Sequence, residues 1–327
     1  MKIGKIHETI LKRSVLNQIK HRRDEVLLGP AIGKNCSIID LNGEDLLAVS
    51  TNPLKDIMNN TGILAVHKTV NNIASSGAEP IGITLSILLP EDTEESSLKV
   101  LIHDVDMVCK ELNIEVFGVE AEVTKVVIKP VLTVTGVGRL KKSDIEKGLA
   151  AIPGQEIVMT KWVGLEGTAI LAKAKEEELL SRYSAAFING AKSMLDYISV
   201  LPEVKIANQV GVTSMHNVTE GGIFGALWEL GAAFKVGLEV DLQKILLKQE
   251  TVEICEYFDL NPYMLISGGC LLMVTDKANF LVESLREEGI EAAVIGRIKE
   301  GNDRLVKNND ELRFLEPSQS DELYKVI

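Results

Sequence analysis

The sequence predicts an α/β chain in which helices and strands are layered in two domains. Of its 327 residues 46% are hydrophobic, enough for a large core, and the length suits about two domains. Apolar runs of strand length alternate throughout with segments whose apolar residues have helical spacing. A basic stretch over residues 139–155, with Gly148, Pro153 and Gly154, interrupts this alternation. We therefore expect one domain over residues 1–150 and another over 151–327.

The elements of the first half follow from apolar spacing and from the residues that stop it. Helical spacing predicts a helix over residues 8–22, after which the Gly29-Pro30 turn introduces short strands. A second helix over 61–76 ends at Gly77-Ala78-Glu79-Pro80. The remaining predictions are a strand over 81–89, a helix over 94–112, and shorter strands over 36–40, 46–50, 114–117 and 130–137.

The second half repeats the interleaving, which supports the same layered class. It opens with a predicted strand over 156–160 and a helix from about 166 to 175. Further helices are expected near 185–200 and 221–234, and strands near 237–240, 270–275 and 292–298.

Charge and cysteine content exclude several classes of protein. The 47 acidic residues outnumber the 35 basic ones, for a net charge of −12, and no basic block of five occurs. We therefore expect neither nucleic acid nor an anionic membrane as a partner, since little would neutralise phosphates. Without an apolar targeting segment or a long apolar run, a cytoplasmic protein is expected. Four widely spaced cysteines, none in a CxxC pair, predict neither a disulfide framework nor a zinc site.

One stretch is a candidate anion site on its residues alone. In His216-Asn217-Val218-Thr219-Glu220-Gly221-Gly222, the threonine can cap a helix and the glycines allow close approach to its backbone. Helix starts of this kind bind phosphates, although each feature also has an ordinary structural explanation. Asn72, between Val70 and Ile73, can likewise be a satisfied buried amide.

Taken together, the motifs resemble the aminoimidazole ribonucleotide (AIR) synthetase superfamily over essentially the whole chain. The resemblance rests on this stretch and on four stretches of the first half: Gly29–Cys36, Ser50–Pro53, His67–Ala74 and Gly118–Thr124. It also rests on Gly77–Pro80, Met159–Trp162, Gly164–Ala169 and Ile266–Gly269. It is nearest to the AIR synthase-related proteins and the hydrogenase maturation factor HypE. It implies a PurM-like fold, in which N-terminal domains pair across a homodimer to form a β-barrel beside a C-terminal α/β domain. It also implies ATP bound with Mg²⁺, and phosphorylation of a substrate atom to make a leaving group.

The chain departs from this family where the family has aspartates. The usual Gly-Glu-Asp, Thr-Asp-Pro, Asn-Asp and His-Asp-Val-Thr phrases are present with Asn35, Asn52, Asn72 and Asn217 instead, and Lys34 replaces an acidic residue. The resemblance implies the following nucleotide-binding positions: Asn35, Asn52, Asn72, Lys161, Asn217, Gly221 and Gly222. Further site candidates are Lys34, His67, Asn71, Glu120, Glu122, His216 and Glu220. No catalytic residue and no metal ligand is assigned.

Two interpretations follow, and the sequence leaves open whether the chain is an enzyme. In one, replacement carboxylates keep an ATP-dependent enzyme active on a small-molecule amide, carbonyl or thiocarboxamide; the candidates are Asp40, Glu44, Glu120, Glu122 and Glu220. In the other, Mg-ATP chemistry is weakened or lost and a pseudoenzyme binds a nucleotide, another anion or a protein partner. Asparagine keeps the shape of aspartate without its charge and holds Mg²⁺ poorly, which favours the second. In it, Lys34, Lys68, Lys161 and the helix start at Gly221 attract the anion. The last residues, 321–327, contain no HypE-type carrier cysteine, so the cyanide-ligand reaction is not expected.

Overall fold

The computed structural model describes residues 3–55, 61–145, 151–318 and 320–327 and divides the chain into two compact units. The N-terminal unit comprises residues 22–30 and 35–144, and the C-terminal unit comprises 1–21, 31–34 and 145–327. Residues 1–21 and 31–34 thus group with the second half of the chain, unlike in the predicted division. The predicted boundary at residue 150 lies outside the described residues. The mixed α/β class with two sheets confirms the predicted fold class.

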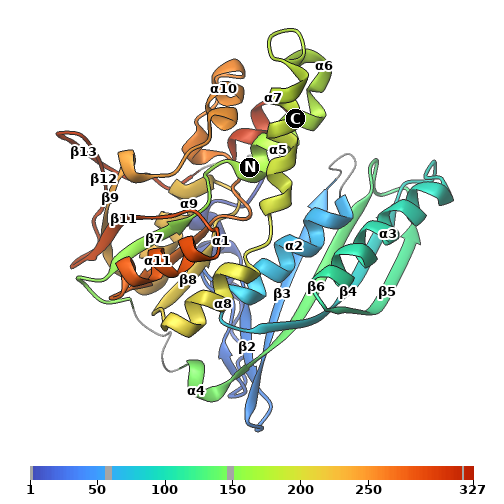
Figure 1. The fold of residues 1–327 in the computed structure, drawn as a ribbon. Coiled ribbons are helices and arrows are strands. Elements are labelled where there is room, and N and C mark those ends of the chain that lie inside the picture. Colours follow the sequence, from blue (N-terminus) through green and yellow to red (C-terminus); the bar gives the residue numbers. More distant parts are fainter. Residues whose placement is uncertain (1–2, 56–60, 146–150, 319) are drawn as a thin grey trace. The chain divides into compact units, whose positions relative to one another are not determined.

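The N-terminal unit is a six-stranded sheet of order β1-β2-β3-β6-β4-β5. Its strands are β1 (Val26–Leu28), β2 (Ser37–Asp40), β3 (Asp45–Lys55), β4 (Glu79–Leu89), β5 (Glu115–Val123) and β6 (Val131–Lys141). Neighbours are antiparallel except β4 and β5, whose parallel pairing is connected by helix α3 (Glu95–Glu111). Figure 1 shows α2 (Thr61–Ala74) and α3 next to each other against the sheet. The short helix α4 (Lys142–Ile145) ends the unit.

The burial of α2 explains why its sequence forms a helix there. Eleven of its fourteen residues are buried, and it contacts β3, β4 and β6. It needs small partners on the sheet: a Cβ at Gly138 would lie 2.4 Å from Ile73, and one at Gly136 would lie 2.6 Å from the same side chain. Glycine at both β6 positions therefore lets the helix lie close to the strands that carry the candidate site.

The C-terminal unit is a seven-stranded sheet of order β13-β12-β9-β11-β7-β10-β8. Its strands are β7 (Glu156–Thr160), β8 (Ser214–Asn217), β9 (Gly237–Asp241), β10 (Leu271–Thr275), β11 (Ala292–Lys299), β12 (Arg304–Asn308) and β13 (Glu311–Phe314). Its α-helices are α1 (Glu8–Ser14), α5 (Leu165–Ala174), α6 (Glu176–Leu179), α7 (Ala185–Ser193), α8 (Leu201–Val210), α9 (Gly222–Phe234), α10 (Gln249–Tyr257) and α11 (Ala278–Glu287). Its 3₁₀ turns are Leu16–Gln18, Met194–Tyr197, Leu242–Lys244, Pro262–Met264 and Glu322–Lys325.

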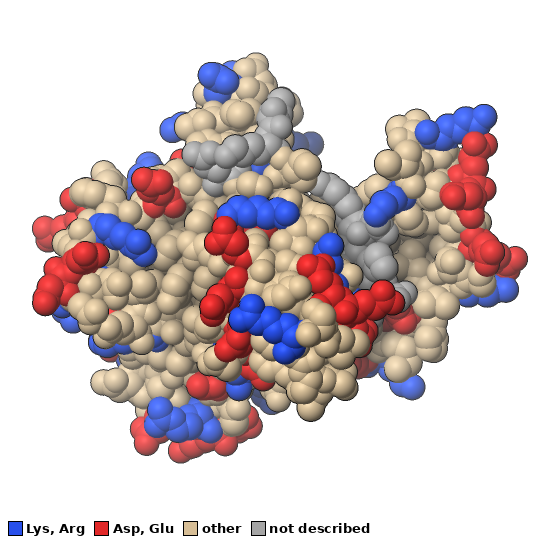
Figure 2. All heavy atoms as spheres, turned by 90° about the horizontal axis from the view of Figure 1, so that it is seen from above, with Lys and Arg blue, Asp and Glu red and all other residues tan. Residues whose placement is uncertain are grey.

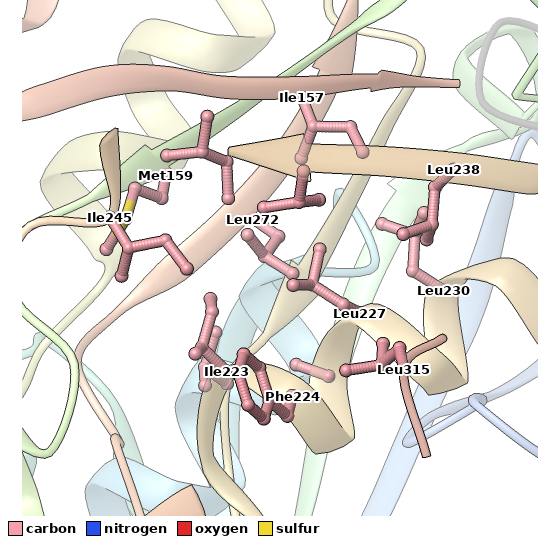
Figure 3. Close-up of a cluster of buried hydrophobic side chains, with 14 of the residues drawn as sticks. Ile157, Met159, Ile223, Phe224, Leu227, Leu230, Leu238, Ile245, Leu272 and Leu315 are labelled. Carbon is pink, nitrogen blue, oxygen red and sulfur yellow. The ribbon is translucent and has the colours of Figure 1, made fainter. Parts of the chain in front are cut away.

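The core of this unit lies between α9 and the sheet. Figure 3 shows Ile223, Phe224 and Leu227 of α9 facing Ile157 of β7 and Leu272 of β10. The intervening residue Val158 is also buried but lies outside this cluster, as strand alternation requires of the opposite face. Strands β7 and β10 are thus covered on both faces, which explains their continuous apolar sequences.

Candidate functional site

In the N-terminal unit, Asn52 and Asn72 form a hydrogen-bonded amide network. Asn52 lies on β3 and Asn72 on α2, and the Asn72 Nδ2 donates to the Asn52 Oδ1 over 3.1 Å. The Asn52 Nδ2 in turn donates to the Ser50 Oγ at 3.1 Å and to the Thr69 Oγ1 at 3.3 Å. The Ser50 hydroxyl donates a hydrogen bond to the Asn35 carbonyl at 2.7 Å. Three of the predicted positions, Asn35, Asn52 and Asn72, therefore lie together. The Asn52 and Asn72 side chains hydrogen-bond each other, and Ser50 links Asn52 to the Asn35 backbone carbonyl.

This network depends on amides at both positions. An amide offers a donor and an acceptor, whereas an ionised carboxylate only accepts. With aspartate at 52 and 72, two carboxylate oxygens would meet at the present 3.1 Å separation with no hydrogen between them. Two carboxylates this close do not both ionise unless a cation lies between them. With asparagine at both positions, a hydrogen bond joins side chains that two ionised carboxylates could bring this close only around a cation.

The other candidates of this unit divide between the two faces of the sheet. His67 and Asn71 are buried on α2, and Lys68 beside them is half-buried. Strand register places Glu120 opposite Ser86 on β4, so the face with Asn52 carries Val119 instead. Glu120 and Glu122 are thus exposed on the opposite face from Asn52 within this unit.

The remaining replacement carboxylates of this unit do not join the network. Asp40 pairs with Lys142 at 2.8 Å, and that hydrogen bond lowers the pKa of Asp40. Glu44 is exposed. Across the described ranges of the chain, no group of three or more His, Cys, Asp or Glu residues is arranged to hold a metal ion.

In the C-terminal unit, the predicted anion stretch runs from β8 into α9, and we call residues 218–222 the α9 loop. Asn217 ends β8 with its side chain buried, and α9 begins after Gly221. Gly221 and Gly222 have φ angles of 87° and 61°, in the left-handed region that favours glycine. A Cβ at Gly222 would lie 2.5 Å from the Tyr263 carbonyl oxygen. The group that closely approaches the backbone at Gly222 is thus a carbonyl of this chain rather than a ligand.

His216 and Glu220 contact charged groups of the same unit. The His216 Nε2 lies 3.2 Å from the Glu229 Oε2, and the Glu229 Oε1 accepts from the Lys5 ammonium at 2.5 Å. Burial alone would raise the pKa of Glu229, but the His216 hydrogen bond and the Lys5 charge lower it to about 2. Glu220 accepts from the backbone N–H of Lys5 at 3.1 Å. Lys5 thus supplies an N–H partner to Glu220 of the motif and a cationic partner to Glu229 of α9.

Lys161 lies in the interior of the unit. Its ammonium donates to the carbonyls of Tyr197 at 2.8 Å and Ser199 at 2.5 Å, and it pairs with the Glu203 Oε1 at 2.6 Å. Burial raises the pKa of Glu203, and the Lys161 charge opposes that shift. Nearby Cys270 is fully buried with its pKa raised to about 12 by desolvation, as expected of a small apolar residue rather than a nucleophile.

Lys34 lies at the far end of α9 from Gly221. Its ammonium lies 4.6 Å from the centre of the Phe234 ring, which ends the helix, and burial lowers its pKa. A Cβ at neighbouring Gly33 would lie 2.4 Å from the Glu229 carbonyl. The two ends of α9 are about 18 Å apart at the usual rise. Lys34 thus lies near the C-terminal end of α9, away from Gly221.

Sequence reasoning missed the residue that does lie at the α9 loop, Asp321. Its Oδ2 accepts from the Gly221 N–H at 2.6 Å, and its Oδ1 accepts from Ile266 at 3.2 Å and Leu323 at 2.9 Å. Only 4% of it is exposed, and desolvation raises its pKa to about 6 against the opposing effect of these N–H groups. A signal existed, since aspartate before Glu322-Leu323-Tyr324 is a typical helix cap, but it does not indicate a distant contact.

The surface carries both signs of charge. Figure 2 shows basic and acidic side chains interspersed over one face, without a broad basic area among the described residues. In the described part of the chain, the helices are too short or too polar to cross a membrane.

Comparisons with known proteins match both halves of the chain. Residues 33–140 match the N-terminal domain, and residues 153–307 the C-terminal domain, of the AIR synthase related proteins. A putative hydrogenase expression/formation protein of Methanocaldococcus jannaschii is 25% identical over 301 residues, covering 90% of this chain and 88% of that protein. A carbamoyl dehydratase HypE of Rhizobium leguminosarum bv. viciae is 24% identical, covering 73% and 68%.

Solved structures show the same fold. HypE in complex with ATP aligns with a TM-score of 0.72 and 20% identity, covering 97% of this chain and 94% of that one. A chain of a HypE–HypF complex aligns with a TM-score of 0.75 and 16% identity, covering 94% and 99%. Both domains of the family match in order, so this chain belongs to the AIR synthase-related family. It shares the two-domain PurM fold of the HypE structures.

Proposed function

We propose that this chain binds a nucleotide or a similar phosphate-bearing ligand and that Mg²⁺-dependent phosphoryl transfer is weakened or lost. The family membership and the likeness to HypE solved with ATP support a nucleotide. The amide network carries the second half of the proposal, because two positions at which the family resemblance implies metal-binding aspartates are here asparagines that hydrogen-bond each other. A ligand at such a site is held by hydrogen bonds rather than by a metal bridge.

The chemistry of phosphoryl transfer explains why this change matters. A triphosphate needs its charge neutralised as the terminal phosphoryl group leaves, and Mg²⁺ on carboxylates usually does this. Asn52 and Asn72 supply no negative charge, and the Asn52 amide already donates to two hydroxyls. Removing four carboxylates favours an anion bound without metal over a metal-bound one.

Calorimetry with ATP, with and without Mg²⁺, tests the proposal. We expect Mg²⁺ to change the affinity by less than about threefold, well inside the tenfold that 1.4 kcal/mol of coupling would give. A variant with aspartate at Asn35, Asn52, Asn72 and Asn217 should gain Mg²⁺ dependence. Asn189→Asp, at an exposed position of α7, is the matched control for added charge.

Mg²⁺ dependence in the unaltered chain would contradict the proposal. Mg²⁺-dependent ATP binding by the unaltered chain, with ADP released into solution, would establish the alternative: an ATP-dependent enzyme that activates a small-molecule amide, carbonyl or thiocarboxamide. Failure of the fourfold aspartate variant to bind Mg-ATP would show that these positions are not the nucleotide site.

We also propose a homodimer formed through the N-terminal unit. Strand β5 is an edge strand, and its Phe117, Val119 and Val123 side chains are 51%, 56% and 60% exposed. An exposed apolar edge strand is a ready surface for pairing with another chain. Light scattering should give a dimer, and Phe117→Lys with Val119→Lys should give a monomer, while Val100→Lys on α3 should not. A monomer in the unaltered chain contradicts the proposal. The likeness to HypE of the HypE–HypF complex supports a protein partner as a further proposal.

A further inference from the structure

Strand β13 is the outer strand of the C-terminal sheet, and it pairs on one side only. Its neighbour is β12, with which it forms a hairpin closed at Asn309 and Asp310, and no other described strand lies beside it (Figure 1). All four of its residues are exposed, including Leu312 at 55% and Phe314 at 68%. An exposed edge strand offers unpaired backbone groups to another strand.

The pairing with β12 determines which backbone groups of β13 point outward. The Leu315 N–H donates to the Arg304 carbonyl at 2.8 Å, so these two residues form a hydrogen-bonded pair. Hydrogen-bonded and non-hydrogen-bonded pairs alternate along an antiparallel ladder. Phe314 and Leu312 are therefore in non-hydrogen-bonded pairs with β12, and their N–H and C=O groups face away from it.

The side chains of β13 are self-complementary about Leu312. Glu311 and Arg313 flank it and lie on the opposite face of the strand, while Phe314 shares its face. When a second copy pairs antiparallel with Leu312 opposite Leu312, each Glu311 lies opposite Arg313 of the other copy, and the apolar side chains meet on the other face. A register centred on Arg313 uses the same outward groups but places two arginines opposite each other, which is unfavourable.

We propose that β13 is a self-association surface: two copies of this chain pair antiparallel through β13, centred on Leu312, and join their C-terminal sheets into one. The two Leu312 residues exchange two N–H···O=C hydrogen bonds, and two ion pairs between Glu311 and Arg313 determine the register. This contact is separate from the one proposed at β5 and requires no nucleotide. A four-residue strand makes a small interface, so the association is weak and depends on concentration.

Charge reversal in the full chain tests the pairing, in a Phe117→Lys, Val119→Lys background that removes the β5 contact. Sedimentation velocity at concentrations up to ~1 mM should show this parent chain forming a dimer. Glu311→Arg and Arg313→Glu, each alone, should weaken the association at least roughly tenfold, because each replaces two attractive pairs by two repulsive ones. Glu283→Arg, at an exposed position of α11, is the control and should leave the association unchanged.

An equimolar mixture of Glu311→Arg and Arg313→Glu gives the sharpest result. Each variant supplies the charges that the other lacks, so the mixture should recover the association of the parent chain. A folding defect in either variant cannot produce this recovery.

A cysteine cross-link tests the register. The four native cysteines are buried, so a cysteine introduced on β13 is the accessible thiol. Opposite residues of a hydrogen-bonded pair have Cα atoms about 5.5 Å apart, within the range of a disulfide. Leu312→Cys should therefore give a disulfide-linked dimer under mild oxidation, and Arg313→Cys should give much less.

Several outcomes would overturn the self-association surface. They are a parent chain that stays monomeric to ~1 mM, single reversals that associate as strongly as the parent, and a mixture that recovers nothing. Cross-linking that favours Arg313→Cys overturns the proposed register. If the Phe117→Lys, Val119→Lys background does not fold, the same reversals in the otherwise unaltered chain report on the association step beyond the β5 contact. None of these results involves ATP, so the nucleotide proposal stands or fails separately.

Discussion

The amide network of the N-terminal unit and the α9 loop of the C-terminal unit differ in how their polar side chains find partners. At Asn52 and Asn72 the charge itself is absent, and the two side chains satisfy each other at 3.1 Å. Around the α9 loop the charges remain, but each has a partner: Glu229 contacts Lys5 and His216, and Asp321 accepts backbone N–H groups. In one region the partners are neutral amides and hydroxyls, and in the other they are charged side chains and backbone N–H groups.

This difference determines how each region should respond to change. A neutral hydrogen-bonded pair contributes about 1 kcal/mol and is insensitive to pH, whereas a buried charge stripped of its partner costs several. The C-terminal unit should therefore be the more sensitive to single substitutions and to pH. The following predictions test this contrast in order of expected effect.

The largest effect is expected at the buried pair of Lys161 and Glu203, whose side chains are 8% and 0% exposed. Lys161→Met should lower the free energy of unfolding by about 3–5 kcal/mol, because it leaves a buried carboxylate without its cation. The unpaired acid then binds a proton more readily in the folded state, so the loss should be greater at pH 8 than at pH 5. Urea denaturation measures it.

A matched control for this pair is Lys205→Met, at an exposed position of α8, the helix that carries Glu203. It should change the stability by less than about 0.5 kcal/mol. A Lys161→Met loss as small as this would mean that the pair is not buried in solution.

The next effect is the pH dependence of the C-terminal residues 320–327, in which Asp321 accepts from the Gly221 N–H. The pKa of Asp321 is raised from 3.8 to about 6 in the folded chain, so these residues bind a proton when packed on the α9 loop that they do not bind when released. Their packing should weaken as pH rises from about 4 to about 6 and then stay constant, by up to about 3 kcal/mol in total. Exchange in residues 320–327, corrected for intrinsic rates, measures this.

Neighbouring groups give this prediction a control. Asp321 faces Glu220, whose charge contributes to the raised pKa, as well as Cys255 and Tyr324, whose own pKa values the Asp321 charge raises. Glu220→Gln should therefore move the transition to lower pH, and Asp321→Asn should abolish it. A transition unchanged in Asp321→Asn would assign it to another group.

A smaller effect is expected in the amide network. Asn72→Ala leaves the Asn52 Oδ1 without this donor and should lower the free energy of unfolding by about 1–3 kcal/mol. The loss should be the same at pH 5 and pH 8, because neither partner titrates. Asn189→Ala, at an exposed position of α7, is the control. If both variants lose the same free energy of unfolding, the Asn52–Asn72 hydrogen bond does not stabilise the fold.

The smallest effect belongs to the exposed pair of Lys99 and Glu95 on α3, 2.7 Å apart with side chains 75% and 79% exposed. Lys99→Gln should change the stability by about 0.3–0.5 kcal/mol and less at high salt. A loss comparable to that of Lys161→Met would show that burial is not what separates the two ion pairs.

Much of the fold was predictable because its signals are local. The helical spacing of 61–76 and the apolar run of 81–89 correspond closely to α2 and β4. Helix α8 was not predicted, although Pro202 lies in its first turn, where proline is favourable. Helix α10 was missed as well, since its few buried residues, including Thr251 and Ile254, leave a weak apolar pattern.

The candidate site was predictable as a set of positions but not as a set of contacts. The motifs led to Asn52, Asn72 and the α9 loop, which the structure shows as a hydrogen-bonded network and a helix start. Motifs alone did not show that Lys161 faces Glu203, because the partner is 42 positions away on helix α8. The position of Lys34 beside Phe234 likewise depends on how α9 packs.

By itself, the sequence determined the family, the layered α/β class and the presence of amides at the motif positions. Those properties are written in residue identity and in spacing over a few turns of chain. Only the tertiary structure decided that Asn52 meets Asn72 and that Asp321 reaches Gly221 across 100 positions. Hydrogen bonds between such distant residues form only after the hydrophobic core has packed the strands and helices, and no local pattern records which polar groups will then meet.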